Sequence, residues 1–328
     1  MAGRPRAPVT LVPPAAVMNR AAIAAEVLSF VDVLPLITDT DSCITFLAQR
    51  RLIRNTYDCA ICNVPCGRVV RRGVDGCEWR CRQCRRRKSL RDGSFFSGSH
   101  LTLKQLIILI HLWCDDQPQT YMKIQTGIDS DDTMVDWCNF LRDICVRHMG
   151  LVGQNWPGLG GLDNAGNPIT VEIDETYFFH RKYHRGRIRR GKWVFGAVER
   201  GTGRCVMRCV HRRNRQTLER LIRRWLLPGT HIVSDAWPAY NHLDQINGGV
   251  YTHDVVVHQQ NFVDPRYPWI HTQTIEGLWK LSKKKLRRQH GTSRTLFNSY
   301  LYEFMWRRNT GDNKFGEMVN CIGHFYPV

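Results

Sequence analysis

Residues 169–174 read ITVEID, and this alternation of apolar and polar side chains predicts a β-strand with one buried face. The residues that follow mix further strand patterns with amphipathic helical patterns, which indicates an α/β domain. The other expected strands are KWVFGAV (192–198), RCVMRCV (204–210), HIVSD (231–235) and DVVVH (254–258), and the expected helices span 216–227, 274–288 and 292–308.

Three acidic residues stand out by position in this region. Asp174 and Asp235 each end a predicted strand, and Glu276 lies at the start of the helix expected at 274–288. Carboxylates at strand ends can converge on one edge of an open sheet. Three carboxylates favour Mg²⁺ or Mn²⁺, and two such ions about 4 Å apart cleave phosphodiesters. We therefore interpret the three as a catalytic metal site, rather than as separate turn residues and helix caps.

Two further residues are candidates because of their spacing from these acids. Lys283 lies two helical turns after Glu276 on the same helix face, where it can contact a DNA backbone beside the metal site. Glu172 shares a strand face with Asp174 and is a candidate to support the ligands from behind. The basic run at 280–288 is expected to follow phosphates rather than to be a merely solvated face.

The charge balance of the whole chain points to nucleic acid. The 328 residues include 47 Lys+Arg against 29 Asp+Glu, a formal net charge of +18, which suits a polyphosphate partner better than a membrane surface. The most apolar stretch, residues 101–113, is too short to span a membrane and contains Lys104 and His111. Prolines interrupt the apolar run of residues 1–20, so a signal peptide is not expected.

Four of the 13 cysteines form two matched pairs. Cys59 and Cys62 are separated from Cys81 and Cys84 by 18 residues, which predicts a closed, structural zinc ribbon rather than a redox site. Two more cysteines, Cys66 and Cys77, lie inside the segment and are expected not to bind the metal. The basic residues that make this ribbon a natural phosphate binder are Arg80, Arg82, Arg85, Arg86, Arg87 and Lys88.

A helical region follows the ribbon. It predicts three short helices between residues 100 and 150, of which Asp132–His148 would enter a major groove in a helix-turn-helix arrangement. Arg142 and Arg147 are the basic candidates on this helix, whereas Asp131, Asp132 and Asp136 at its start are an awkward fit to DNA. A plain helical linker is the alternative.

These patterns divide the chain into seven parts. A glycine-, asparagine- and proline-rich linker is the clearest boundary. The expected parts are a flexible basic amino terminus (1–20), in which GRPR at 3–6 has the composition of a minor-groove hook, a short helical segment (21–51), the zinc ribbon (52–98), the helix-turn-helix-like module (99–150), the linker (151–168), the catalytic domain (169–309) and a carboxy-terminal tail (310–328).

Several blocks of the sequence resemble the Merlin superfamily of DDE transposases and its bacterial insertion-sequence relatives. These blocks are VEIDETYF, WVFGAVER, IVSDAWPAY and HTQTIEGLWKLSKKKLR, together with CAIC and WRCRQCRRRKSLRDGSFF upstream. The resemblance spans about residues 25–309 and implies a ribonuclease H-like catalytic domain with Asp174, Asp235 and Glu276 as metal ligands. Many bacterial relatives have Asn where this chain has Gln273, so Gln273 remains the alternative to Glu276 as the third catalytic residue.

The expected function is that of a cut-and-paste DNA transposase. It would bind the terminal inverted repeats of an element, cleave their ends and join the 3′-hydroxyl to target DNA, as a homo-oligomer that holds both ends. Two rival functions remain, a transposase-derived DNA-binding host protein that no longer cuts and a nuclease acting on RNA–DNA hybrids. The expected location is the nucleus in a eukaryotic host and the nucleoid otherwise.

Overall fold

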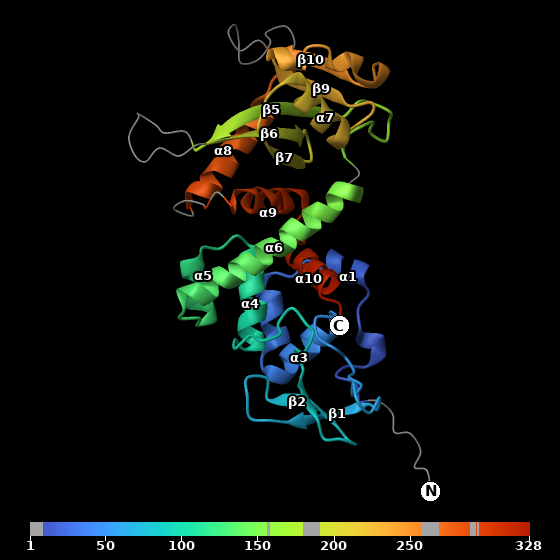
Figure 1. Cartoon of the computed structure of the whole chain (residues 1–328), viewed down its shortest axis with the longest axis vertical. Coiled ribbons are helices and arrows are strands. Elements are labelled where there is room, and N and C mark those ends of the chain that lie inside the picture. The colour runs from blue at the N-terminus through green and yellow to red at the C-terminus, as the bar shows by residue number, and fades with distance from the viewer. Residues whose placement is uncertain (1–8, 156–157, 180–190, 257–268, 289–292, 294) are drawn as a thin grey trace. The chain divides into compact units, whose positions relative to one another are not determined.

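The computed structural model describes residues 9–155, 158–179, 191–256, 269–288, 293 and 295–328. The chain forms two compact units, Met1–Ile144 with Thr310–Val328, and Cys145–Asn309 (Figure 1). The GRPR segment at 3–6 lies outside the described residues. No helix among the described residues is long and apolar enough to cross a membrane.

The first unit combines a small antiparallel sheet with short helices. The sheet has the order β1-β2-β3, and each strand pairs with its neighbour antiparallel. The helix α6 begins in this unit and continues past its boundary. The elements are α1 (Arg20–Ala25), α2 (Phe30–Val33), α3 (Thr40–Gln49), β1 (Cys66–Val70), β2 (Cys77–Cys81), β3 (Arg87–Ser89), α4 (Leu103–Cys114), α5 (Gln119–Thr126), α6 (Asp131–Asn155) and α10 (Lys314–Phe325), with 3-10 turns at Pro14–Ala16 and Leu34–Ile37.

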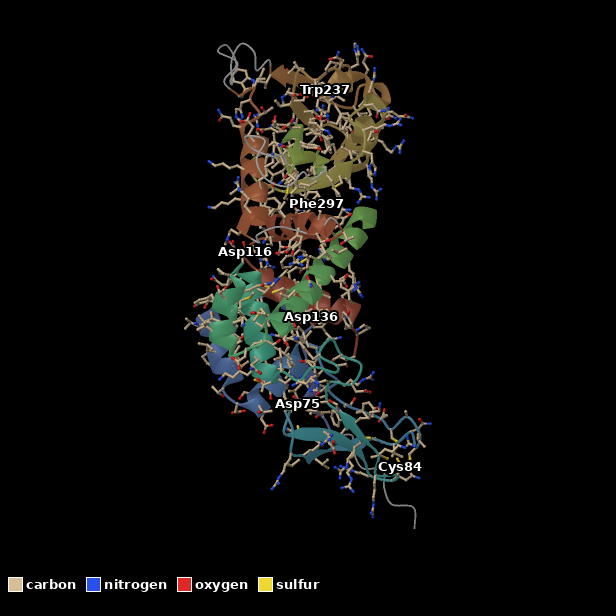
Figure 2. All side chains as sticks on the ribbon, turned by 60° about the vertical axis from the view of Figure 1, so that its left-hand side comes forward. Asp75, Cys84, Asp116, Asp136, Trp237 and Phe297 are labelled. Atoms are coloured by element: carbon tan, nitrogen blue, oxygen red, sulfur yellow. The ribbon has the colours of Figure 1, made fainter. Side chains whose placement is uncertain are left out.

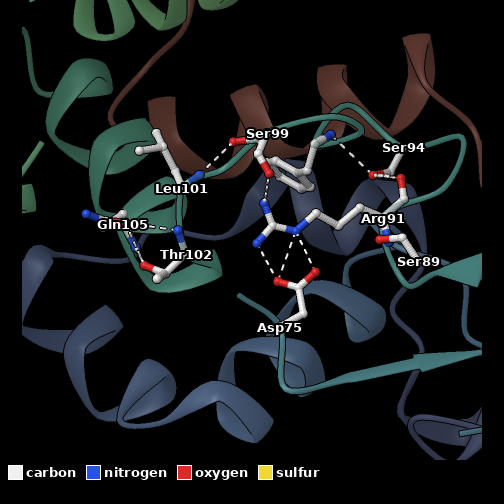
Figure 3. Close-up of polar contacts among 9 residues, drawn as sticks. Asp75, Ser89, Arg91, Ser94, Ser99, Leu101, Thr102 and Gln105 are labelled. Atoms are coloured by element: carbon white, nitrogen blue, oxygen red, sulfur yellow. Dashed lines mark hydrogen bonds and ion pairs between the residues drawn. The ribbon is translucent and has the colours of Figure 1, made fainter. Parts of the chain in front are cut away.

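A buried ion pair joins the sheet of this unit to the segment that leads into α4. The Arg91 Nε donates to both carboxylate oxygens of Asp75, at 2.8 and 3.0 Å, and both side chains are almost fully buried. The same guanidinium donates to the carbonyl of Ser99 (3.3 Å), four residues before α4 begins (Figure 3). Thr102 then starts α4 with a capping box, in which the side chains of Thr102 and Gln105 each accept a hydrogen bond from the backbone N–H of the other residue.

Helix α10 replaces the tail expected at 310–328. It contributes buried Phe315, Met318 and Val319 to the first unit, a helical spacing of apolar residues that favours packing over a loose tail. Gly316 lets it approach α1, because an added Cβ would lie 2.5 Å from the carbonyl oxygen of Glu26. The predicted start of the linker at residue 151 is also too early, because α6 stays helical to Asn155.

The second unit is a five-stranded mixed sheet of order β10-β9-β5-β6-β7. Strands β5, β6 and β7 are antiparallel, and β9 and β10 run parallel to β5. Helices α8 and α9 pack on β5, β6 and β7, while α7 places Trp225 against Phe195 on the opposite face. The elements are β4 (Leu159–Gly160), β5 (Thr170–Phe178), β6 (Lys192–Glu199), β7 (Cys205–Val210), α7 (Arg215–Trp225), β8 (Leu226–Leu227), β9 (His231–Asp235), β10 (Thr252–Val256), α8 (Gln273–Arg288) and α9 (Phe297–Asn309), with 3-10 turns at Pro238–Tyr240 and Leu243–Gly248.

The expected strands and helices of this unit are all present, with shifted ends. The last helix, expected from 292, begins at Phe297. The shift that bears on the site concerns the first strand, which was expected to end at Asp174 and continues to Phe178. Its pairing with β9 stops at Glu172, but its pairing with β6 on the other side persists to Phe178. Asp174 therefore lies inside its strand, and the prediction of a strand end there was wrong.

Candidate functional site

Asp174 and Asp235 lie on neighbouring strands and on the same face of the sheet. The parallel register of β5 and β9 pairs Glu172 with Val233, and each aspartate follows two residues later on its own strand. Side chains two residues apart on a strand point to the same face, and neighbouring strands are about 4.8 Å apart. Both aspartates are half-buried. The register thus brings the first two predicted ligands together.

Helix α8 lies along β5 and makes three successive hydrogen bonds to it. Every second residue of β5 bonds to every fourth residue of α8. The spacing matches because two residues span about 6.6 Å along a strand and four residues span about 6 Å along a helix. The same helix therefore passes the first aspartate in a fixed register. The bonds are Ile275 N to Glu172 Oε2 (2.9 Å), Trp279 Nε1 to Asp174 Oδ2 (2.8 Å) and Lys283 Nζ to Thr176 Oγ1 (2.6 Å).

The close approach of α8 to the sheet depends on Gly196. This residue pairs with Asp174 across β5 and β6, and an added Cβ would lie 2.3 Å from Cη2 of Trp279. The indole thus occupies the space above the glycine while its N–H reaches the neighbouring carboxylate. A glycine inside a strand often marks such an approach. The sequence contains this signal in WVFGAV, but its partner, Trp279, could not be read from it.

Glu276 is exposed and lies on the flank of the sheet-facing side of α8. Taking Trp279 as the direction of the sheet, Glu276 is rotated by about 60° around the helix and Gln273 by about 120°. The negative charges of Asp235 and Glu276 act on Asp174, whose pKa is raised to about 6, mainly by burial. Glu276 therefore lies closer to the sheet-facing side of α8 than Gln273 does, and its role as the third ligand stays a prediction.

The three acids suit a hard divalent cation in their chemistry. Burial and two neighbouring negative charges disfavour ionisation of Asp174, and a bound cation would relieve this. Within the described residues, however, the carboxylates of Asp174, Asp235 and Glu276 do not form a group with all ligand atoms within 4.8 Å. A pair of ions can bridge a wider set of ligands than a single ion, and Glu276 is exposed, which leaves its side chain free rotamers.

Glu172 holds the start of α8 rather than touching the candidate ligands. Its fully buried carboxylate accepts hydrogen bonds from Thr274 Oγ1 (2.7 Å), Ile275 N (2.9 Å) and Arg200 Nε (2.6 Å). Arg200 in turn donates to the carbonyl oxygens of Trp269 and His271, both at 2.6 Å. A carboxylate at a helix amino terminus is stabilised by the helix dipole. Glu172 therefore fixes where α8, and with it Glu276, begins.

A second buried acid, Glu175, anchors the segment after β9. Its carboxylate accepts a hydrogen bond from the hydroxyl of buried Tyr240 (2.6 Å), and burial raises the pKa of Glu175 to about 7. Sequence reasoning missed this contact, because the two residues are 65 positions apart. The pair holds the turn Pro238–Tyr240 against the sheet directly after Asp235.

Lys283 is half-buried and points to the strand. Besides its bond to Thr176, its ammonium lies 5.4 Å from the ring centroid of Phe178, and burial lowers its pKa. Exposed cations of the same helix lie further round, at Lys280, Lys284 and Arg287. With a spacing of four and three residues these form one stripe. This stripe, which continues from Glu276, is the better candidate for contact with a DNA backbone.

The four predicted zinc ligands come together in the first unit. The sulfur atoms of Cys59, Cys62, Cys81 and Cys84 all lie within 4.8 Å of one another, and Cys59 and Cys84 are 3.6 Å apart. Zn–S bonds of about 2.3 Å in a tetrahedron require sulfur atoms about 3.8 Å apart. The group therefore fits zinc, and Figure 2 shows Cys84 beside the small sheet.

Two tight turns shape this cysteine group. In the second, Arg85 has a φ of 61°, and the backbone N–H groups of Gln83 and Cys84 point at the Cys81 sulfur, both at 3.4 Å. These N–H groups lower the pKa of Cys81 to about 6, which favours the thiolate that zinc requires. Cys77 instead accepts a hydrogen bond from Arg68 (3.2 Å).

Three ribbon arginines are available for phosphate. Arg82, Arg85 and Arg86 are exposed and have no ion-pair partner among the residues that the structure describes, whereas Arg87 pairs with Glu78 at 3.1 Å. The module is thus a basic surface built on a closed metal site.

The helical region contains the three expected helices, with a turn at 127–130 between α5 and α6. Gly127 ends α5 with a φ of 66°, as a left-handed helix end requires. Arg142, however, is buried and donates to Asn139 (2.6 Å), so it is not a DNA contact. Asp131 is paired with Lys123 at 2.5 Å. Binding of DNA by this region stays a prediction.

Comparison with known proteins gives a class for the second unit. Residues 165–309 match the family of ISXO2-like transposase domains, which supports a relationship with insertion-sequence transposases and DNA recombination. The strand order of the sheet, three antiparallel strands followed by two parallel ones, agrees with the expected ribonuclease H-like fold.

Individual relatives are more distant. The chain is 22% identical over 304 residues to the Male abnormal protein mab-31 of Caenorhabditis elegans, covering 86% of this chain and 67% of that protein. Among solved structures, the catalytic core domain of BIV integrase is similar at 15% identity and a TM-score of 0.30, over 41% of this chain and 80% of that one. A simian T-cell lymphotropic virus intasome in complex with PP2A regulatory subunit B56 gamma has the same identity and TM-score, over 61% and 67%.

Proposed function

We propose that this chain is a DDE transposase of the Merlin type, which cleaves DNA at the ends of a mobile element and joins the 3′-hydroxyl to target DNA. The observation that supports the proposal is the register of β5 and β9, which puts Asp174 and Asp235 on the same face, together with the hydrogen bond to Asp174 from α8, the helix that carries Glu276. The match of residues 165–309 to transposase domains supports it independently.

Each residue has a defined task in this proposal. Asp174, Asp235 and Glu276 would hold two Mg²⁺ or Mn²⁺ ions, which activate the attacking hydroxyl and stabilise the leaving oxygen of a phosphodiester. Trp279 orients the Asp174 carboxylate through its N–H. Glu172 fixes the first turn of α8. Lys283 adds a positive charge near Asp174.

The first unit would supply double-stranded DNA binding. A structural zinc ion at Cys59, Cys62, Cys81 and Cys84 would hold the ribbon that presents Arg82, Arg85 and Arg86. The helices α4 to α6 would then read the terminal inverted repeats. A homo-oligomer would hold two element ends together, in the nucleus of a eukaryotic host or on the nucleoid of a bacterium.

The test is a cleavage assay with duplexes that carry the flanking element ends. Wild-type chain with Mg²⁺ or Mn²⁺ should nick or cut them, and Asp174→Asn, Asp235→Asn and Glu276→Gln should each abolish cleavage while DNA binding persists. Gln273→Ala is the matched control, because Gln273 is also exposed on the first turn of α8. Cleavage that survives in Glu276→Gln and fails in Gln273→Ala would transfer the third position to Gln273. Cleavage that survives in Asp174→Asn or Asp235→Asn would refute the site.

A catalytically silent, DNA-binding host protein is the second candidate. It is favoured by the similarity to a protein named for a male abnormal phenotype rather than for transposition. Binding of DNA without cleavage by the wild-type chain under all metal conditions, together with the absence of inverted repeats around its gene, would favour this alternative.

A further inference from the structure

We propose that Trp237 is a stacking site for an unpaired DNA base next to the phosphate that is cut. This inference rests on the proposed function and adds a nucleotide-binding site to it. Trp237 follows Asp235 by two residues, and its backbone N–H donates to Asp235 Oδ1 (3.1 Å). The residue is 36% exposed, which leaves part of a large aromatic surface open to a ligand, and Figure 2 labels its position in the second unit.

The indole of Trp237 is held in place by contacts with Arg213. Its Nε1 donates to the carbonyl oxygen of Arg213 (3.3 Å), and the Arg213 guanidinium lies 4.6 Å from its ring centroid. Pro238 follows and restricts the backbone of Trp237, which is extended with φ −65° and ψ 127°. The Tyr240–Glu175 hydrogen bond anchors the same turn. An exposed tryptophan so restrained loses little conformational entropy when a ligand stacks on it.

Arg213 in turn packs on Trp193 of the sheet, whose ring lies beside that of Tyr177. The Arg213 guanidinium lies 3.6 Å from the ring centroid of Trp193, and Trp193 lies 5.1 Å from Tyr177, its partner across β5 and β6. Arg213 has no carboxylate at ion-pair distance among the described residues. The stack therefore combines an aromatic surface with a positive charge.

A nucleobase is the ligand that this combination fits best. Every base has a flat π-face, base–aromatic stacking requires no particular sequence, and arginine adds a cation for the adjoining phosphate. A base inside a duplex is covered by its neighbours and cannot stack on a protein ring unless it leaves the helix. The backbone of Trp237 adjoins Asp235 at the edge of the sheet where β9 ends, while its ring packs through Arg213 toward Trp193 on the α7 face. The base concerned therefore belongs to a nucleotide that passes this edge of the sheet beside the cut, where strands separate during cleavage and joining.

The experiment uses the full chain carrying Asp174→Asn, so that the DNA stays intact, and two duplexes of the same sequence. One has a short single-stranded overhang containing 2-aminopurine, and the other is blunt. With Trp237 present, we expect the 2-aminopurine fluorescence to fall on binding, since stacking quenches it. Trp237→Ala should abolish the quenching and weaken binding of the overhang duplex by about 5- to 150-fold, the range for one stacked base. Binding of the blunt duplex should not change.

Matched variants separate stacking from folding and assembly. Trp237→Phe keeps an aromatic face and should restore most of the quenching, and the thermal unfolding of all variants should agree. Equal quenching and affinity with Trp237→Ala would overturn the inference, as would a loss of oligomer in that variant at unchanged quenching. If cleavage requires Asp174 and Asp235 but Trp237→Ala still quenches the 2-aminopurine fluorescence, the stacking inference is refuted and the proposed function is not. If no metal-dependent cleavage occurs at all, the proposed function fails first.

Discussion

Replacement of Gly196 by alanine tests the packing that orients Asp174. The new Cβ would lie 2.3 Å from Cη2 and 2.7 Å from Cζ2 of Trp279, where ordinary contacts begin near 3.4 Å. The indole would have to move by about 1 Å, at a cost of about 1–3 kcal/mol for overpacking. Movement would also break its hydrogen bond to Asp174, worth about 1.5–3 kcal/mol for a charged acceptor. We expect Gly196→Ala to lower the free energy of unfolding of the second unit by about 2.5–6 kcal/mol.

Urea unfolding followed by tryptophan fluorescence and circular dichroism measures this change. The double variant Gly196→Ala with Trp279→Phe removes the colliding atoms and should recover most of the packing cost. It cannot restore the N–H donor, so the pKa of Asp174 should rise further and cleavage should remain impaired. Gly277→Ala is the control, because nothing lies within 4 Å of its added Cβ and alanine favours a helix by about 1 kcal/mol.

Two results would refute this reasoning. One is a Gly196→Ala chain whose stability lies within about 0.5 kcal/mol of wild type, the usual effect of a surface change. The other is a double variant, Gly196→Ala with Trp279→Phe, that is no more stable than Gly196→Ala alone. This result would show that the added methyl group does not collide with Trp279.

Five other predictions rest on the contacts described. The pKa of Asp174 is raised from 3.8 to about 6, so between these pH values the folded metal-free chain keeps a proton that the unfolded chain has lost. The free energy of unfolding should therefore fall by about 3 kcal/mol as the pH rises from about 4 to 7. Urea titrations at each pH measure this fall, which should be smaller in Asp174→Asn. Stabilisation by Mn²⁺ should grow over the same pH window, and a melting temperature shift that is independent of pH would contradict this. Glu172→Gln leaves Arg200 without its buried charge partner and should cost about 3–5 kcal/mol, whereas a loss below 1 kcal/mol would show that Glu172 does not hold α8. Cys81→Ser should lower the bound zinc from one ion to none, as measured by mass spectrometry, while Cys77→Ser should keep the ion. Arg86→Ala should reduce the slope of the logarithm of the DNA-binding constant against the logarithm of salt concentration by about one.

The sequence identifies features whose signal is local. Alternation in ITVEID and the apolar run of HIVSD predict the two central strands, because a strand alternates over consecutive residues. The pairs Cys59/Cys62 and Cys81/Cys84 predict their own cluster, since two sulfurs two residues apart already share a turn. The candidate acids were likewise found by their place relative to these elements.

The features that it missed depend on contacts between distant residues. The segment DETYF carries acids and a threonine, so its continuation of the strand to Phe178 depends on pairing with β6 rather than on composition. Trp279 meets Asp174 across 105 positions, and Tyr240 meets Glu175 across 65. Arg142 looked like a DNA contact because a helical pattern alone does not say which face is buried.

The position of α10 bears on how this protein is made. The chain leaves the first unit after Ile144 and returns to it at Thr310, so the transposase-like unit is an insertion within a discontinuous one. During synthesis residues 9–144 emerge before the inserted unit, whereas Phe315, Met318 and Val319 emerge only after it. A truncation near residue 309 would therefore spare the inserted five-stranded sheet and destabilise the first unit instead.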